Sequence, residues 1–265
     1  MQSGSVVFDR AVGFYDETRG FPPGVETHVA DLLQQAGGLT KASKLIEIGV
    51  GTGRIALPLA PHVKAIYGVD LSRAMMLRLR EKQTDEPIAL AEGDITRLPF
   101  PANTFDAAVA VHIFHLVSDW RGAVDELARV LRPDAVLLSG GNTHDGTEKL
   151  MRDAMRQALP ADKRRNSSED QPRPVDLPTS AGWQLVGEPH VYRFKIQQSI
   201  AGFLERVKGR TWSILWQLDD TELAHCVDAV RAAIEVEFGD ANRVIESESS
   251  FEVRVFMPPR SSSPM

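Results

Sequence analysis

Short apolar runs alternate with segments of helical spacing through the first half of the chain. Each run is too short for a helix and is followed by a glycine or a polar residue, as is typical of buried strands in a parallel sheet. Between two of these runs, residues 120–131 place Val124, Leu127 and Leu131 on one helical face. The pattern predicts parallel strands connected by helices. The predicted strands are residues 45–48, 65–69, 88–91, 105–111 and 135–139.

The flanking segments show other patterns. Residues 5–40 are predicted to be helical, with a break at Phe21-Pro22-Pro23-Gly24. Residues 160–180 combine prolines with a charged polar run and are predicted to form a mobile loop. The segments beyond it are predicted strands at 183–186 and 191–196, predicted helices at 200–207 and 221–238, and a final alternating strand at 251–256.

The most informative segment is the turn after the first strand, which reads KLIEIGVGTGR. Three glycines alternate there, at Gly49, Gly51 and Gly53, and a helix-like segment follows. Glycine accepts a positive φ and lets a ligand approach the backbone closely. The start of the helix offers free N–H groups and a partial positive charge. Together these features predict a nucleotide-type binding site.

An acidic residue, Glu47, lies two positions before the first glycine. A turn that binds a pyrophosphate uses N–H groups and disfavours a carboxylate beside them. S-adenosylmethionine has a sulfonium and an α-ammonium and no phosphate, so a carboxylate favours it. Gly51, Gly53 and Ala56 also fit the dinucleotide pattern G-x-G-x-x-A, so an NAD(P)-dependent oxidoreductase stays open as an alternative.

A second acidic residue, Asp70, follows the second strand. An acid at this position of a dinucleotide fold takes both ribose hydroxyls. Asp70 is therefore a predicted ribose ligand. It can also serve as the cap of the helix that follows.

Four motifs in order resemble class I S-adenosylmethionine-dependent methyltransferases, and most closely their ubiquinone/menaquinone-biosynthesis-like branch, which methylates small molecules. The motifs are ExGxGxG at 47–53, GVDLS..MM at 68–76, GDI..LPFP...FD at 93–106 and LRPDAVLL at 131–138. The resemblance covers roughly residues 8–141. One departure is Pro133-Asp134-Ala135, where the family usually has Pro-Gly-Gly. It concerns turn geometry and not the cofactor.

The resemblance implies an α/β fold, a Rossmann-like doubly wound seven-stranded sheet whose last strand is antiparallel. It also implies N-terminal helices and a lid insertion in the C-terminal half. The expected organisation is an N-terminal helical cap at 1–40 and an S-adenosylmethionine-binding core at 41–150. A lid and substrate region with the remaining core elements is expected at 151–248, and the final strand and tail at 249–265.

The resemblance also implies a set of cofactor contacts. Tyr15 and Arg19 would lie on a helix that folds over the cofactor. Met75 or Met76 would lie next to the adenine ring with Ile95 beside it, and Asp94 would accept its amino group. The full predicted cofactor set is Tyr15, Arg19, Glu47, Gly49, Gly51, Gly53, Asp70, Leu71, Met75, Asp94, Ile95 and His112.

Two histidines, His112 and His115, follow the fourth strand, at the edge where α/β folds place ligands. In the family the first tends to approach the methionine moiety and the second the substrate. Both are candidate catalytic bases, and His144 is a third. Their spacing also resembles a metal site, but no nearby Cys or Glu completes a ligand set, so no metal is predicted.

Composition narrows the range of partners. The formal net charge of −6 argues against nucleic acid, whose binders usually carry a basic face. The single cysteine, Cys226, excludes an internal disulfide and a structural zinc site, and is predicted to be a core residue. The N-terminus lacks a signal pattern, and no apolar run reaches membrane-span length. A cytoplasmic monomer or homodimer acting on a small-molecule acceptor is expected, with a non-catalytic S-adenosylmethionine-binding protein as a further alternative.

Overall fold

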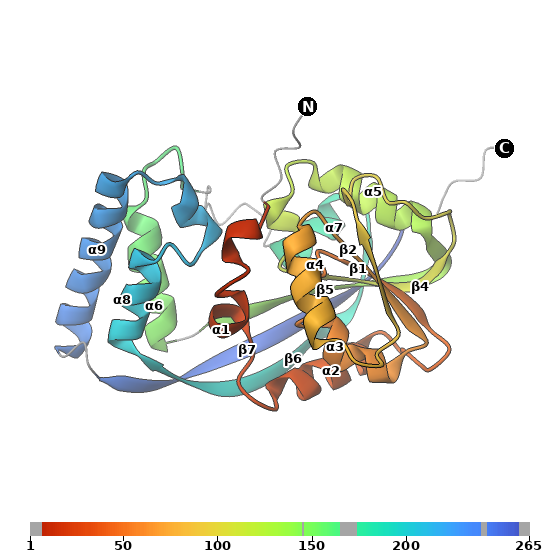
Figure 1. Ribbon diagram of the computed structural model, residues 1–265, viewed down its shortest axis with the longest axis horizontal. Coiled ribbons are helices and arrows are strands. Elements are labelled where there is room, and N and C mark those ends of the chain that lie inside the picture. The colour runs from red at the N-terminus through yellow and green to blue at the C-terminus, as the bar shows by residue number, and fades with distance from the viewer. Residues whose placement is uncertain (1–6, 145, 165–173, 240–242, 260–265) are drawn as a thin grey trace. The chain divides into compact units, whose positions relative to one another are not determined.

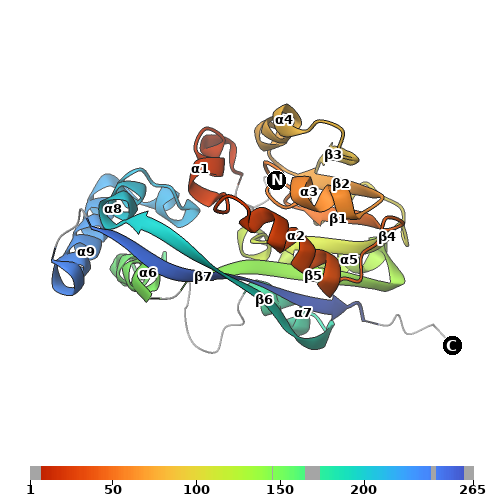
Figure 2. The ribbon, with the colours of Figure 1, turned by 90° about the horizontal axis from the view of Figure 1, so that it is seen from below.

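The computed structural model describes residues 7–144, 146–164, 174–239 and 243–259. Its centre is a seven-stranded sheet with the order β3-β2-β1-β4-β5-β7-β6 (Figures 1 and 2). The first five strands are parallel neighbours, and β7 is antiparallel. The strands are β1 (Lys44–Ile48), β2 (Ala65–Asp70), β3 (Ile88–Glu92), β4 (Phe105–Val111), β5 (Leu131–His144), β6 (Gln184–Ser199) and β7 (Val244–Met257). The predicted Rossmann-like fold is confirmed.

The chain forms two compact units. Unit 1 comprises Met1–Gly141, Pro172–Tyr192 and Phe251–Met265, and unit 2 comprises Asn142–Gln171 and Arg193–Ser250. The candidate cofactor residues all belong to unit 1.

Unit 1 buries apolar side chains on both faces of the central strands. Ile46 and Ile48 of β1 pack in one cluster with Val124 and Leu127 of α5. Helices α2 and α3 cover the opposite face of the sheet (Figure 1). The helical elements of unit 1 are η1 (Asp9–Ala11), α1 (Tyr15–Arg19), α2 (Val25–Ala36), α3 (Ala56–Leu59), η2 (Ala60–His62), α4 (Arg73–Lys82), η3 (Phe114–Leu116), α5 (Trp120–Val130), η4 (Pro174–Asp176) and α7 (Leu177–Ser180).

Unit 2 has its own apolar core, formed by three helices and a short 3-10 helix. They are α6 (Gly146–Ala158), α8 (Ile200–Lys208), η5 (Ser213–Gln217) and α9 (Asp220–Phe238). Met151, Phe203, Leu215 and Val230 are completely buried in this core. Cys226 is buried with them, as predicted. A capping box between Asp219 and Glu222 fixes the start of α9.

The strands of the second half are longer than the apolar pattern predicted. The two predicted segments at 183–186 and 191–196 form one strand, β6. Gly187 and Pro189 interrupt the pattern, but β6 lies at the sheet edge, where a proline is tolerated and exposed positions need no apolar side chain. Likewise Arg132, Pro133 and Asp134, which lie between the helical pattern at 120–131 and the strand predicted at 135–139, belong to β5.

The lid predicted in the second half stays a prediction. Residues 165–173 of the predicted mobile loop lie outside the described residues. Beyond them, α7 and the first half of β6 belong to unit 1, whereas α8 and α9 belong to unit 2.

Candidate functional site

The glycine turn lies directly after β1. Gly49, Gly51 and Gly53 all have positive φ, at 70°, 52° and 81°. The backbone N–H groups of Gly49 and Val50 donate to the carbonyl oxygen of Val69, at 2.8 and 3.2 Å. The turn is thereby fixed to the end of β2, and only glycine adopts its backbone conformation without strain.

The three glycines have different surroundings. A Cβ atom at Gly49 would lie 2.5 Å from Ile113 Cδ1, and one at Gly53 would lie 2.7 Å from Leu79 Cγ. A Cβ at Gly51 would lie no closer than 3.6 Å to any neighbour, the nearest being Met75 Cε. The outer glycines therefore make room for protein side chains. A Cβ at the middle one would meet only ordinary van der Waals contacts, so this glycine is not required to make room for a protein side chain.

Glu47 lies in β1 beneath this turn and is 3% exposed. Its Oε2 atom has no hydrogen-bond partner among the described residues. Burial raises the pKa of the Glu47 carboxyl well above its ordinary value, Arg54 opposes this shift, and Asp70 adds to it. A buried carboxylate with an unused oxygen is costly unless a donor or a cation reaches it.

Among the charged groups, Arg54 has the largest effect on the pKa of the Glu47 carboxyl, and it lowers that pKa. Its Nη1 donates to the carbonyl oxygen of Arg19 at 2.9 Å, and its guanidinium lies 4.5 Å from the ring centroid of Phe21. Burial lowers the pKa of Arg54, while the charges of Tyr15 and Glu47 raise it. The sequence pattern did not predict a role for Arg54. The available signal was a charged residue at the start of an otherwise apolar helix.

Asp70 joins the ends of β1 and β2. Its Oδ2 accepts from the N–H of Gly51 and its Oδ1 from the N–H of Ser72, both at 2.8 Å. Burial raises the pKa of Asp70, and these backbone hydrogen bonds oppose the shift. Each carboxylate oxygen has two acceptor sites, so both oxygens retain capacity for a ligand hydroxyl.

Asp70→Ala is expected to destabilise the protein by about 1–3 kcal/mol, because it leaves two N–H groups at a largely buried site without acceptors. Urea unfolding followed by circular dichroism measures this change. Asp85→Ala, which removes an exposed carboxylate, serves as the control. Equal stability of the two variants would show that the Asp70 hydrogen bonds contribute nothing.

The N-terminal helices are tied to the turn by carboxylates. Asp16 in α1 accepts from Thr52 Oγ1 at 2.5 Å and from Lys82 Nζ at 2.9 Å. Burial works against ionisation of Asp16, but these bonds and the nearby positive charges lower its pKa. Asp9 accepts from Ser72 Oγ at 2.6 Å. The helix that carries Tyr15 and Arg19 therefore lies against the glycine turn and α4.

The residues expected at the adenine are placed around β3 and α4. Met75 is 2% exposed and lies beside Gly51, and Leu71 is half-buried. Ile95 is buried in the core of unit 1. Asp94 accepts from the N–H and the Oγ1 of Thr96 at 2.9 and 2.8 Å, both through Oδ1. The Asp94 side chain therefore fixes its own turn, whichever ligand it also contacts.

His112 follows β4 in a left-handed conformation, with φ of 54°. Its N–H donates to the carbonyl oxygen of Gly140 at 3.2 Å. The His112 and His115 rings are perpendicular, with centroids 6.4 Å apart. A histidine with positive φ is uncommon, and such residues gather at functional sites.

The comparisons with known proteins agree with this geometry. Residues 46–139 match the family model described as a methyltransferase domain. The match begins in β1 and ends in β5, so it includes the glycine turn, Asp70, Asp94 and His112. Residues 46–139 are a class I methyltransferase domain. The resemblance inferred from the four motifs is confirmed.

Two relatives of this domain have names that refer to a lipid and to a quinone. A phosphatidylethanolamine N-methyltransferase from Cereibacter sphaeroides is 40% identical over 96 residues, which are 35% of this chain and 47% of the relative. A 2-phytyl-1,4-naphtoquinone methyltransferase from Nostoc punctiforme is 39% identical over 97 residues, 34% of this chain and 42% of the relative. This chain therefore spans about half the length of these sequence relatives.

The fold is shared with solved structures. The crystal structure of the YcgJ protein from Bacillus subtilis matches with a TM-score of 0.57 at 21% identity, covering 88% of this chain and 99% of that chain. At this identity the likeness establishes the fold alone.

Two further findings apply to the described part of the chain. It contains no group of three His, Cys, Asp or Glu side chains placed to hold a metal ion. None of its helices combines the length and the apolar character needed to cross a membrane.

S-adenosylmethionine fits the methyltransferase domain as the structure shows it. The unused Glu47 oxygen is a suitable acceptor for an ammonium group, and the glycine at position 51 allows a ligand to approach the backbone closely. The carboxylate of Asp70 retains acceptor sites for hydroxyls.

Proposed function

We propose that the protein is an S-adenosylmethionine-dependent methyltransferase that acts on a small-molecule acceptor. The observation that carries the proposal is the buried Glu47 carboxylate, whose Oε2 has no partner among the described residues, beneath a turn of three positive-φ glycines. A pyrophosphate at this turn would bring a second negative charge to a buried carboxylate, which is unfavourable at low dielectric. An α-ammonium would instead supply the missing donor and an opposite charge.

The proposed binding roles follow from position. Glu47 and the backbone of Gly49, Gly51 and Gly53 hold the amino-acid end of the cofactor, and Asp70 holds the ribose hydroxyls. Leu71, Met75, Asp94 and Ile95 surround the adenine. Tyr15 and Arg19 cover the site from α1, which the Asp16–Thr52 and Asp16–Lys82 hydrogen bonds hold in place.

The chemistry asks little of the protein beyond placement. When bound, S-adenosylmethionine supplies a methyl carbon already activated by positive sulfur. The chain's own residues fix the acceptor atom in line with the reacting carbon, at a separation of about 3 Å. Where the acceptor loses a proton, His112 or His115 accepts it on a ring nitrogen. Both residues lie at the carboxyl end of β4, next to the turn through Ile113.

The names of the two relatives refer to different methyl acceptors. One refers to a lipid amine and the other to a naphthoquinone. The proposal therefore stays at the level of a small molecule.

Calorimetric ranking of cofactors tests this proposal. S-adenosylhomocysteine, the demethylated product, is expected to bind at least tenfold more tightly than NAD or NADP. Of these three ligands, only S-adenosylhomocysteine has an ammonium group that can pair with Glu47. The three titrations use one buffer and one protein preparation. Tighter binding of NAD or NADP would overturn the proposal and favour an oxidoreductase.

A further inference from the structure

Unit 2 holds a group of buried and half-buried polar side chains that the proposed methyl transfer does not use. We call it the Arg206 cluster; its members are His144, Glu148, Arg152, Gln198, Arg206 and Ser249. All of them belong to unit 2. They come from β5, α6, β6, α8 and β7, and therefore from separate parts of the sequence.

Positive charge exceeds negative charge in this cluster. Arg152 donates through Nε and Nη2 to Glu148 Oε1, and Glu148 is 3% exposed. The second guanidinium, Arg206, has no salt bridge to a described residue within 4 Å. Burial and the charge of Arg152 lower the pKa of His144 to about 4, so this histidine is neutral near pH 7. Two arginines therefore share one carboxylate.

The unused polar atoms of the cluster are donors. Arg206 Nε and Gln198 Nε2 are buried and have no hydrogen-bond partner among the described residues. Arg206 Nη2 donates to Gln198 Oε1 at 2.9 Å, which fixes the orientation of the amide and leaves its NH₂ group as the free end. What the cluster lacks is an acceptor.

Aromatic rings hold the two guanidinium groups in place. Arg152 lies 5.0 Å from the ring centroid of Trp212, and Arg206 lies 5.7 Å from the same ring and 5.5 Å from that of Phe203. Trp212 is 7% exposed and Phe203 is completely buried. The positive groups are thus preorganised on a rigid apolar support, as a specific anion site requires.

Exposed cations on β6 and β7 are each paired with a carboxylate. Arg193 pairs with Glu248 and Lys195 with Glu246, all on exposed positions of β6 and β7. Each exposed cation there has its own carboxylate. The Arg206 cluster departs from this arrangement although burial makes an unpaired charge far more costly.

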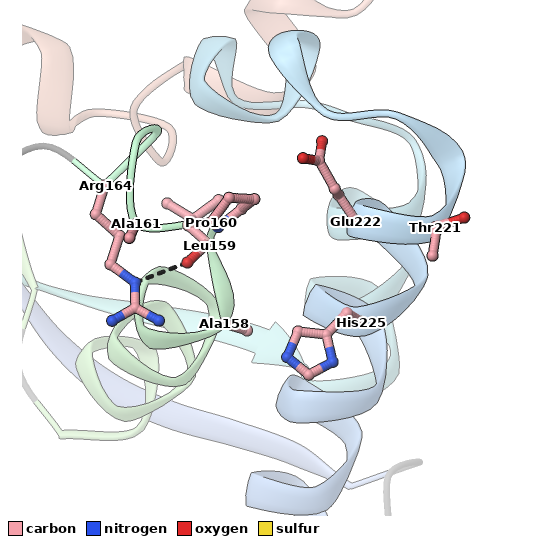
Figure 3. Close-up of a pocket in the computed structure, with 8 residues that line it drawn as sticks. All are labelled: Ala158, Leu159, Pro160, Ala161, Arg164, Thr221, Glu222 and His225. Carbon is pink, nitrogen blue, oxygen red and sulfur yellow. Dashed lines mark hydrogen bonds between the residues drawn. The ribbon is translucent and has the colours of Figure 1, made fainter.

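A visible hollow in unit 2 does not share these properties. It measures about 440 Å³ and is lined by Ala158, Leu159, Pro160, Ala161, Arg164, Thr221, Glu222 and His225 (Figure 3). Its charged groups are engaged: Arg164 donates to the carbonyl oxygen of Leu159 at 2.7 Å, and Glu222 accepts from Lys163. It therefore offers no comparable excess of donors.

We infer that the Arg206 cluster is a binding site for an oxyanion group, a carboxylate or a phosphate, carried by a small molecule. The anion would accept from Arg206 Nε and Gln198 Nε2 and offset the second guanidinium charge. This inference concerns unit 2 alone and does not rest on the proposed methyl transfer.

The test is an NMR titration of arginine side-chain Nε–H signals in the full-length protein, at constant ionic strength set with chloride. Inorganic phosphate and succinate are the two probes, in separate titrations, and distinguish a phosphate site from a carboxylate site. A saturable shift of the Arg206 Nε–H signal with one or both probes is expected. The absence of a saturable shift with both would overturn the inference.

Two variants and a control make the test specific. Arg206→Lys keeps the charge but removes the Nε donor, and is expected to weaken probe binding at least tenfold. Gln198→Glu supplies the missing acceptor from within, so it should raise the melting temperature and abolish probe binding even if the first variant folds poorly. Arg156→Lys changes an exposed arginine that pairs with Asp153, and should bind as the wild type does. Equal loss in the control, or undiminished binding by Gln198→Glu, would contradict the assigned site.

Discussion

Glu47→Gln is expected to weaken the binding of S-adenosylhomocysteine by about 2–4 kcal/mol, or roughly thirty- to a thousandfold. The substitution keeps the shape of the side chain, removes its charge and replaces one acceptor oxygen with an NH₂ donor. The lost energy is that of a charge-assisted bond between the cofactor ammonium and a carboxylate that is 3% exposed. Isothermal titration calorimetry measures the change directly.

The same substitution is expected to stabilise the ligand-free protein above neutral pH. The folded-state pKa of Glu47 is raised by burial, so its contribution to stability is fully present below its ordinary pKa of 4.5 and is lost as the pH rises through the raised value. Glutamine carries no such dependence. Urea unfolding at pH 8 should therefore favour the variant, and the difference should disappear below pH 4.5.

Glu81→Gln is the matched control for both measurements, because Glu81 is exposed on α4 and pairs with Arg78. It should change neither cofactor affinity nor the pH dependence of stability. Undiminished binding by Glu47→Gln would show that Glu47 is not the partner of the ammonium. If Glu47→Gln is more stable than the wild type and binds the cofactor equally well, the Glu47 carboxylate destabilises the protein and has no role in cofactor binding.

Gly51→Val is expected to abolish cofactor binding while the protein stays folded. The φ of Gly51 is 52°, so a β-branched residue adds strain of about 1–3 kcal/mol. No protein atom lies within 3.6 Å of the new Cβ, so the side chain occupies the space assigned to the ligand. Circular dichroism and calorimetry with S-adenosylhomocysteine separate the two effects.

Gly53→Ala provides the contrasting case. Its Cβ would lie 2.7 Å from Leu79 Cγ, so the main effect is expected on stability, through the packing of α4, with a smaller effect on affinity. If Gly51→Val binds normally, the middle glycine serves only the turn. If both variants lose binding and stability together, the three glycines share one structural role.

The sequence predicted the parts of the fold that depend on local pattern. The central strands β1 and β4 are buried on both faces, so each appears as an apolar run, and the glycine turn follows β1 as expected. By contrast, β6 is mostly exposed at the sheet edge, and its pattern gave two fragments where the structure has one strand. An edge strand is fixed by hydrogen bonds to its neighbour, which leave little trace in hydropathy.

The site was predictable only where one motif contains the interacting residues. Glu47, Gly51 and Asp70 could be named as candidates because the roles proposed for them follow from position along the βαβ unit. Arg54 was missed because its partners Phe21 and Arg19 lie in another element.

The Arg206 cluster was missed for the same reason. His144 appeared as a candidate base, but Arg152 and Ser249 surround it from elements that are far apart in the sequence. A histidine with a pKa of about 4 is a poor general base near neutral pH.

The most direct test of the proposed function is transfer of a labelled methyl group. The protein is incubated with S-adenosylmethionine labelled at the methyl carbon and a small-molecule extract, with the Glu47→Gln variant as the control. Methyl transfer predicts label in a low-molecular-mass product, formed with the wild type and at least tenfold less with the variant. Binding of S-adenosylmethionine without transfer of label to any small molecule, across extracts of different origin, would contradict a methyltransferase and leave a binding protein.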